Sequence, residues 1–217
     1  MLLVIDTALA ALSLALLDGE RVVASHHEVI GRGHAEALMT AVAALVGDGP
    51  PPTAIIVDIG PGSFTGLRIG IAAARALGLA WNVPVTGYSS LALIAAPCLA
   101  ADPALGRLAV VAEAGRGQLY VQVLDREFVA EQDAVALTAS EAAVWLDPLL
   151  ALAGPGAASV RPASSPRLRG NDGEAETAHV IAETWPDARD AWRLPPAARN
   201  LPPTPLYVRP PDAVLPT

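Results

Sequence analysis

A glycine-rich stretch from Gly60 to Gly70 contains the residues whose types and spacing most resemble a ligand site. It follows an apolar run at residues 54–57 and leads into residues 71–81, a pattern that predicts a turn between a strand and a helix. The N–H groups at a helix N-terminus favour an anion, and glycine lets the backbone approach that anion closely. The residues that could bind a phosphate are Gly60, Gly62, Ser63 and Thr65 in this turn, with Asp6 and Thr7 after the first apolar run.

The charged residues weigh against an independent phosphate site. All 14 basic residues are arginine, so the chain lacks the lysine of a P-loop and the lysine of a Schiff-base enzyme. The formal net charge of -8 disfavours a protein that binds nucleic acid by itself, because such proteins cluster cations against phosphates. What approaches the glycine turn therefore stays open among a phosphate, another element of the chain and a second protein.

No group of side chains in the sequence assembles into a catalytic constellation. Ser63 and Thr65 have no histidine close in the chain to act as a base. Cys98 is the single cysteine and there are only four histidines, so a zinc site has few possible ligands, and His34 at a helix start is more typical of a capping or packing residue than of a base. We therefore expect no catalytic residue, no metal site and no cofactor, in a protein of the reducing cytoplasm.

The helix after the glycine turn carries a strip of small residues on one face. The residues that recur there every four positions are Gly66, Gly70, Ala74 and Gly78. Three glycines inside a helix cost roughly 3 kcal/mol relative to alanine, so a close contact must compensate for them. That contact is either the chain's own sheet or first helix, or a second protein. The first helix also has small residues, Ala37, Ala41 and Ala44, and two such helices could dock against a matching pair.

The hydrophobic pattern predicts an α/β protein with two domains, residues 1–104 and 105–217. The first domain is predicted to contain strands at residues 2–5, 12–17, 21–29, 54–58 and 83–86, and helices at 34–46, 71–81 and 89–99. The second is predicted to contain strands at 108–112, 119–124, 128–137 and 149–153, and helices at 140–146 and 175–184. Thr138 and Glu141 form a capping-box pattern before the helix at 140–146. Pro84 and Pro97 interrupt the apolar stretch at 77–101, so we expect no membrane span.

Four segments of the chain together resemble the TsaB (YeaZ) family. They are Ile5-Asp6-Thr7, His34 at the first helix, the stretch from Gly60 to Gly70, and Pro205-Leu206-Tyr207-Val208-Arg209. The resemblance implies an actin-like ATPase (ASKHA) fold with two RNase H-like α/β domains and mixed sheets. It also implies a non-catalytic scaffold subunit that binds and activates a TsaD-like catalytic paralogue in the threonylcarbamoylation of adenosine 37 (t6A) of tRNAs.

The same resemblance implies the partners of the chain. TsaB proteins bind the TsaD-like paralogue through their first two helices, a TsaE-like ATPase joins the complex, and ATP, ADP and the metal belong to those partner subunits. Without its partner the chain is expected to form a homodimer, and tRNA is expected to contact it only indirectly. Combining the small-residue strip with this resemblance, we predict a partner interface made of His34, Leu38, Ala41, Gly66, Arg68, Gly70 and Ala74.

Departures from the paralogue indicate that the chain is not an enzyme. Ser90 and Ile94 stand where the paralogue has a pair of metal-binding histidines, and neither side chain suits the ion. Glu113 to Arg116 replaces a small phosphate-facing turn, with a carboxylate at one position. The competing hypothesis is a stand-alone nucleotide-dependent or glycoprotease-like metallo-hydrolase, for which the glycine turn and Asp6 are the motivation.

Overall fold

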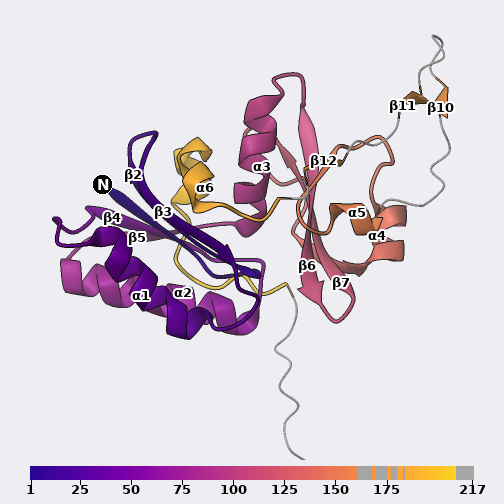
Figure 1. The fold of residues 1–217 in the computed structure, drawn as a ribbon. Helices are drawn as coiled ribbons and strands as arrows, with labels where there is room; N and C mark the ends of the chain where they lie inside the picture. The colour runs from indigo at the N-terminus through magenta and orange to yellow at the C-terminus, as the bar shows by residue number, and fades with distance from the viewer. Residues whose placement is uncertain (161–167, 170–174, 177–179, 183, 209–217) are drawn as a thin grey trace, which may run out of the picture.

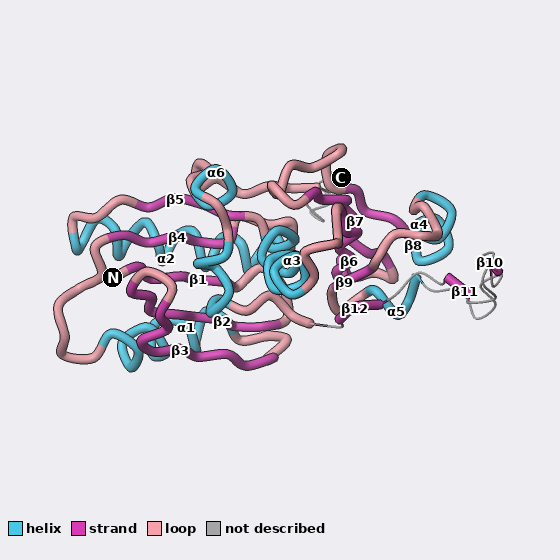
Figure 2. The backbone as a smooth tube through the Cα atoms, turned by 90° about the horizontal axis from the view of Figure 1, so that it is seen from above, coloured by secondary structure: helices cyan, strands magenta, loops and turns pink. Residues whose placement is uncertain are grey.

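The N-terminal half of the chain forms a five-stranded mixed sheet in the order β3-β2-β1-β4-β5. The computed structural model describes residues 1–160, 168–169, 175–176, 180–182 and 184–208. The strands of this sheet are β1 (Leu2–Asp6), β2 (Ala11–Asp18), β3 (Arg21–Val29), β4 (Ala54–Asp58) and β5 (Val85–Tyr88). β1, β2 and β3 form an antiparallel meander, whereas β1, β4 and β5 run parallel, and Figure 2 shows all five side by side. Because parallel strands end at the same edge, the loops after β1 and β4 lie next to each other.

Helices cover both faces of this sheet, which explains the apolar character of its central strands. α1 (His34–Val46) and α2 (Phe64–Trp81) lie side by side on one face, where they pack against Leu3 and Ile5 of β1. Val4 points to the opposite face, into the core that contains α3 (Ser90–Ala101) and the 3-10 helix η1 (Ala188–Arg193). This alternation is the period of two that a strand imposes.

The second sheet has the order β12-β9-β6-β7-β8, and α3 stands between it and the first sheet (Figure 1). Its strands are β6 (Arg107–Gly115), β7 (Gln118–Asp125), β8 (Val135–Thr138), β9 (Leu152–Ala153) and β12 (Val180–Ala182). α4 (Ala139–Trp145) and α5 (Ala157–Val160) cover the face away from α3. The predicted capping box at the start of α4 is confirmed: the Thr138 N–H donates to Glu141 Oε2 at 2.8 Å and the Glu141 N–H to Thr138 Oγ1 at 3.3 Å.

The C-terminal segment returns to the first sheet, and this corrects the predicted second domain of residues 105–217. η1 packs on β2, and α6 (Pro196–Arg199) packs on β5. Leu201 exchanges two backbone hydrogen bonds with Gly87 at the end of the first sheet, of 2.6 and 3.0 Å. Residues 188–208 therefore pack with the first sheet, although the linker-like composition near residue 104 predicts that they belong to the second domain.

Three predicted elements of the second half differ from the structure, and the first is the strand expected at 149–153, which is confined to Leu152–Ala153. The strand expected at 128–137 is confined to Val135–Thr138, because Asp125 Oδ1 accepts the N–H groups of Glu127 and Val129 and closes a turn in which Phe128 has a φ of 63°. The helix expected at 175–184 is wrong in its described part, which contains β12 and the short β11 (Ala175–Glu176), paired with β10 (Leu168–Arg169). The rest of that prediction, residues 177–179 and 183, lies outside the described residues. Among the described helices, none has the length and apolar character needed to cross a membrane.

Candidate ligand cleft and docking face

The first part of the glycine-rich stretch, residues 60–63, forms the predicted turn between β4 and α2, whereas residues 64–70 already belong to α2, which begins seven residues before the predicted helix at 71–81. Ser63 is the N-cap of α2, and its Oγ accepts the Gly66 N–H at 3.3 Å. Gly60 has a φ of 110°, in the region that favours glycine, and the Ser63 N–H donates to Ala8 O at 2.7 Å. A Cβ at Gly62 would collide with the carbonyl group of Ala8, so this turn needs glycine for a close approach to the loop after β1.

The glycine strip of α2 packs against the chain's own first sheet. A Cβ at Gly66 would collide with the Thr7 carbonyl oxygen, one at Gly70 with Thr7 Oγ1, and one at Gly78 with the side chain of Val85. Thr7 Oγ1 also donates to Gly66 O at 2.8 Å, which ties the helix to the end of β1. The roughly 3 kcal/mol cost of these glycines is therefore offset inside the molecule. The hypothesis that this strip accepts a second protein is wrong.

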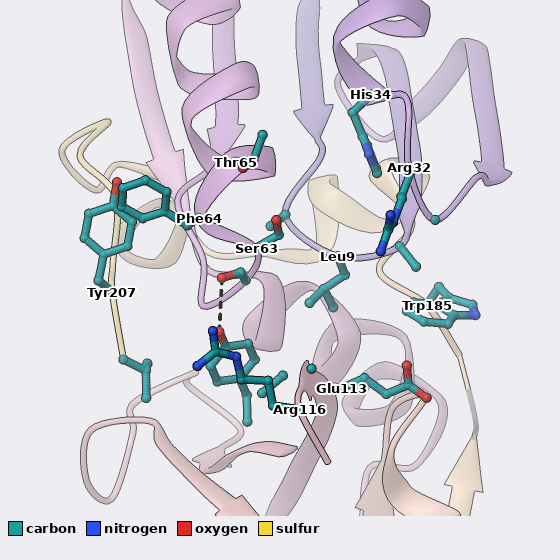
Figure 3. Close-up of a pocket in the computed structure, with 18 residues that line it drawn as sticks. Leu9, Arg32, His34, Ser63, Phe64, Thr65, Glu113, Arg116, Trp185 and Tyr207 are labelled. Atoms are coloured by element: carbon teal, nitrogen blue, oxygen red, sulfur yellow. Dashed lines mark hydrogen bonds between the residues drawn. The ribbon is translucent and has the colours of Figure 1, made fainter. Parts of the chain in front are cut away.

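A cleft of about 540 Å³ separates the N-terminus of α2 from the second sheet. Figure 3 shows Ser63 on one wall and Arg116, from the turn between β6 and β7, on the other. Arg32, which precedes α1, reaches in from the first wall. The Tyr120 hydroxyl donates to Gly62 O at 3.1 Å and joins the two walls at the base. The remaining side chains on the lining include His34, Phe64, Glu113, Trp185 and Tyr207.

Only part of the predicted phosphate site faces this cleft. Gly62, Ser63 and Thr65 line it, beside the N-terminus of α2, and the two arginines add positive charge. Asp6, Thr7 and Gly60 do not line it, which corrects their prediction as ligand residues. Asp6 is fully buried, and the Thr7 hydroxyl donates a hydrogen bond to Gly66 O. Gly60 is covered by the carbonyl group of Leu206. Of the predicted phosphate-binding residues, only Gly62, Ser63 and Thr65 are placed to contact an anion in the cleft.

Comparison with known proteins gives the family of the chain. Residues 21–168 match the family model described as TsaD: tRNA N6-adenosine threonylcarbamoyltransferase. A crystal structure of a Pseudomonas aeruginosa protein, described as similar to the peptidase YeaZ, superposes with a TM-score of 0.73 and 27% identity, covering 96% of this chain and 99% of that one. The chain belongs to the TsaD/TsaB (YeaZ) family. The actin-like, two-domain α/β fold expected from the sequence is thereby confirmed.

Two curated members of this family are bacterial proteins of similar description. The tRNA threonylcarbamoyladenosine biosynthesis protein TsaB of Bacillus subtilis is 35% identical over 123 residues, which is 55% of this chain and 52% of that protein. The protein with the same description in Escherichia coli is 36% identical over 123 residues, with the same shares covered. The matched region thus spans about half the length of these curated relatives. A second Pseudomonas aeruginosa structure, YeaZ, superposes with a TM-score of 0.67, 28% identity and 89% coverage of both chains.

Two positions that the resemblance aligns with metal ligands of the paralogue, Ser90 and Ile94, are buried. Ser90 and Ile94 lie on α3 with 0% and 1% of their surface exposed. Ile94 belongs to the hydrophobic core between the sheets. Ser90 Oγ lies 2.9 Å from Asp58 Oδ1 and 3.0 Å from Pro61 O. Neither side chain faces the cleft.

Asp58 forms a buried carboxyl pair with Asp6, which sequence reasoning missed. The two residues end the neighbouring parallel strands β4 and β1, and their exposures are 1% and 0%. Burial, together with the charge of Asp58, raises the pKa of Asp6 well above its usual range. Burial raises the pKa of Asp58 to about 6, against the hydrogen bonds from Gly60 and Ser90 that favour its ionised form. The signal for this pair was an aspartate at the carboxyl end of each of two adjacent parallel strands.

The outer face of α1 and α2 carries exposed small and apolar side chains, with the exposed Arg75 beside them. On α2 the exposed residues Ala72, Ala76 and Leu79 follow helical spacing, and Leu79 has 86% of its surface exposed. On α1 the exposed side chain of Met39 borders a groove of about 400 Å³ between the two helices, which Leu77 and Trp81 also line. We call this surface, made of Met39, Ala43, Ala72, Ala76 and Leu79, the outer helix face.

Most residues of the predicted partner interface do not lie on the outer helix face. Four of the predicted interface residues are buried within the chain and therefore lie on no exposed surface of these helices: Leu38, Gly66, Gly70 and Ala74. His34 is also buried, and its Nε2 lies 3.3 Å from Ala11 O beside the cleft. Ala41 is half-buried toward β3, and only Arg68 is exposed. Arg68 donates to the Tyr207 hydroxyl at 3.0 Å and stacks on Phe64 at 3.7 Å, at the border of the outer helix face.

Proposed function

We propose that the chain is a non-catalytic scaffold subunit that binds and activates a TsaD-like catalytic paralogue in t6A formation on tRNA. The outer helix face carries this proposal. Leu79 and Met39 are exposed beside three alanines, with a groove between the helices, and alanine allows the backbone of another helix to approach. Exposed apolar side chains that lie together favour a protein interface at this face. The descriptions of the curated relatives as t6A biosynthesis proteins support the pathway.

The interior of the site supports a non-catalytic role. Asp6 and Asp58 lie beneath the glycine turn, and both are buried and hydrogen-bonded inside the chain, whereas the acidic side chain that lines the cleft is Glu113. A general acid or base must reach the proton that it moves, and neither residue lines the cleft. The proposal assigns no cofactor to this chain and assigns ATP, ADP and the metal to the partner subunits.

The proposal extends to the remaining partners. A TsaE-like ATPase joins the pair of TsaB-like and TsaD-like subunits, and tRNA contacts this chain only indirectly. In the absence of the paralogue, the outer helix face pairs with the same face of a second copy, because a two-fold axis lets one patch cover itself. The net charge of -8 supports the indirect contact with tRNA.

The experiment is a reconstitution of tRNA modification with the TsaD-like paralogue of the same organism. We expect modification to require the chain, and Leu79→Glu to abolish both co-purification and modification, since a buried unpaired charge opposes docking. Ala143→Glu, on the exposed surface of α4, is the matched control and should behave as the wild type. Unchanged co-purification of the Leu79→Glu protein would overturn the proposed docking face.

A hydrolase that works alone is the competing function, and Arg32 and Arg116 in the cleft favour it, because both could contact a phosphate. Calorimetry with ATP or ADP and Mg²⁺ separates the two functions. Tight binding with turnover by the isolated chain would replace the scaffold proposal. The scaffold proposal predicts no turnover.

A further inference from the structure

The buried carboxyl pair lies directly beneath the turn that forms the wall of the cleft. Asp58 Oδ1 accepts the Gly60 N–H at 2.7 Å, and Asp6 Oδ1 lies 3.4 Å from the Ala8 N–H. Gly60 and Ala8 begin the two loops that meet at the N-terminus of α2. The ionisation of either carboxyl group therefore acts on backbone that leads into the cleft.

Two hydroxyl groups each lie between a carboxylate and a backbone carbonyl. The Tyr88 hydroxyl is 3.2 Å from Asp6 Oδ2 and 3.2 Å from Ile5 O. The Ser90 hydroxyl is 2.9 Å from Asp58 Oδ1 and 3.0 Å from Pro61 O. Each hydroxyl has one proton, so it can donate to only one of its two acceptors. Ser90 thus has a choice between a side chain and the cleft-side turn.

The pair cannot lie buried with both carboxyl groups ionised at low cost, because like charges in a region without water repel strongly. Asp58 Oδ2 is buried, and no N–H or O–H group of the described residues donates to it. A proton on Asp6 relieves both problems, since Asp6 can then donate to Asp58. The high pKa of Asp6, caused by burial and by the neighbouring carboxyl group, agrees with this arrangement.

Other charged groups around the pair do not remove this conflict. Tyr88 of β5 contacts Asp6, and burial raises its pKa well above the usual range, so it stays a neutral donor. The negative charge of Asp187, which precedes η1, also acts on Tyr88 and helps to raise its pKa. Ser90 at the start of α3 contributes a hydroxyl and no charge.

We propose that Asp58 and Ser90 form a proton-controlled latch on the cleft: Ser90 donates to Asp58 while Asp58 is ionised, and to the Pro61 carbonyl once Asp58 is protonated. Asp6 keeps its proton in both states. In the ionised state the Ser90 bond to the carboxylate is charge-assisted, which makes it the stronger of the two choices. In the protonated state Asp58 donates to Ser90 Oγ, and Ser90 in turn donates to Pro61 O.

The latch reaches the second sheet through one further residue. Pro61 is followed by Gly62, whose carbonyl accepts the Tyr120 hydroxyl at 3.1 Å from β7. Uptake of a proton by Asp58 therefore fixes the turn that Tyr120 holds, and loss of the proton releases the Pro61 carbonyl. The pKa of about 6 for Asp58 places this exchange in mildly acidic solution, within reach of ordinary buffers.

The test is an NMR titration of the labelled full chain between about pH 5 and about pH 8, a range that brackets the change. The ¹³Cγ signals of the aspartates report ionisation, and the Pro61 ¹³C′ and Gly62 ¹⁵N signals report the hydrogen bond to the Pro61 carbonyl. We expect one aspartate to titrate with a midpoint near the Asp58 pKa of about 6, with the Pro61 and Gly62 signals shifting at the same midpoint.

Variants separate the latch from a general response to pH. Ser90→Ala should abolish the shift of the Pro61 and Gly62 signals while an aspartate still titrates. Asp58→Asn should remove both changes, and Asp18→Asn, on the exposed end of β2, should remove neither. The wild-type titration alone can refute the latch: Pro61 and Gly62 signals that stay flat, or aspartates that all titrate near their ordinary pKa of about 4, would overturn it.

Discussion

The two faces of α2 are both built from small residues, yet they do different work. On the inner face, Gly66, Gly70 and Gly78 let the helix touch Thr7 and Val85 of the first sheet. On the outer face, Ala72 and Ala76 are exposed to solvent. A glycine is required where backbone must meet backbone, whereas alanine keeps a helix stable and its surface open. A strip of small residues in a sequence therefore indicates close packing, but it does not indicate whether the packed neighbour is the chain's own sheet or a second protein.

The largest loss of stability is expected from a substitution on the inner face of α2. Gly66→Val should lower the free energy of unfolding by at least about 3 kcal/mol, because its side chain would meet the Thr7 carbonyl, which is backbone and cannot move aside. Urea unfolding measures it. The matched change on the outer face, Ala72→Val, is the control, and equal losses for the two variants would contradict the assignment of the faces.

A pH series tests the carboxyl pair beneath the inner face. The folded-state pKa of Asp58 is raised to about 6, above its value in the unfolded chain, so the folded protein holds more protons between those two values. Stability from this group is therefore greatest in acid and falls as the pH rises through about 6. Asp58→Asn should flatten that fall in a series of unfolding measurements. A wild-type stability that rises over the same range, with Asp58→Asn unchanged in slope, would speak against a buried pair.

A smaller effect is expected at the end of the glycine strip. Gly78→Ala should cost about 2 kcal/mol, less than Gly66→Val, because the new methyl group would displace Val85 Cγ2 and lie 3.2 Å from Val83 O, while alanine recovers helix propensity. Thermal unfolding compares it with Gly66→Val. A loss as large as that of Gly66→Val would mean that the inner face is uniformly rigid.

The smallest effect is expected on the outer face. Ala72→Val should change the free energy of unfolding by less than about 0.5 kcal/mol, since the residue is exposed in the isolated chain. Differential scanning calorimetry measures this change. A large loss would place Ala72 in contact with the chain itself and would remove it from the docking face.

Most helices and strands of the first sheet were predictable from the sequence, but the contacts between elements that are distant in the chain were not. Periodicity placed α1 at His34–Val46 and β3 at Arg21–Val29, and the capping box located the start of α4, because each signal is local. The direction of the glycine strip was missed, since spacing defines a face and not what covers it. Asp58 was overlooked because its role depends on a strand more than fifty residues away in the chain, and the return of residues 188–208 to the first sheet is likewise a long-range contact.

The central claim is that the outer helix face, and not the glycine strip, receives the TsaD-like paralogue. Its most direct test is the affinity of the folded Ala76→Glu variant for that paralogue, measured by calorimetry beside Ala143→Glu on α4. We predict that Ala76→Glu weakens binding by at least about 100-fold, because it buries an unpaired charge at the interface, and that Ala143→Glu binds as the wild type does. Wild-type affinity for Ala76→Glu would contradict the account.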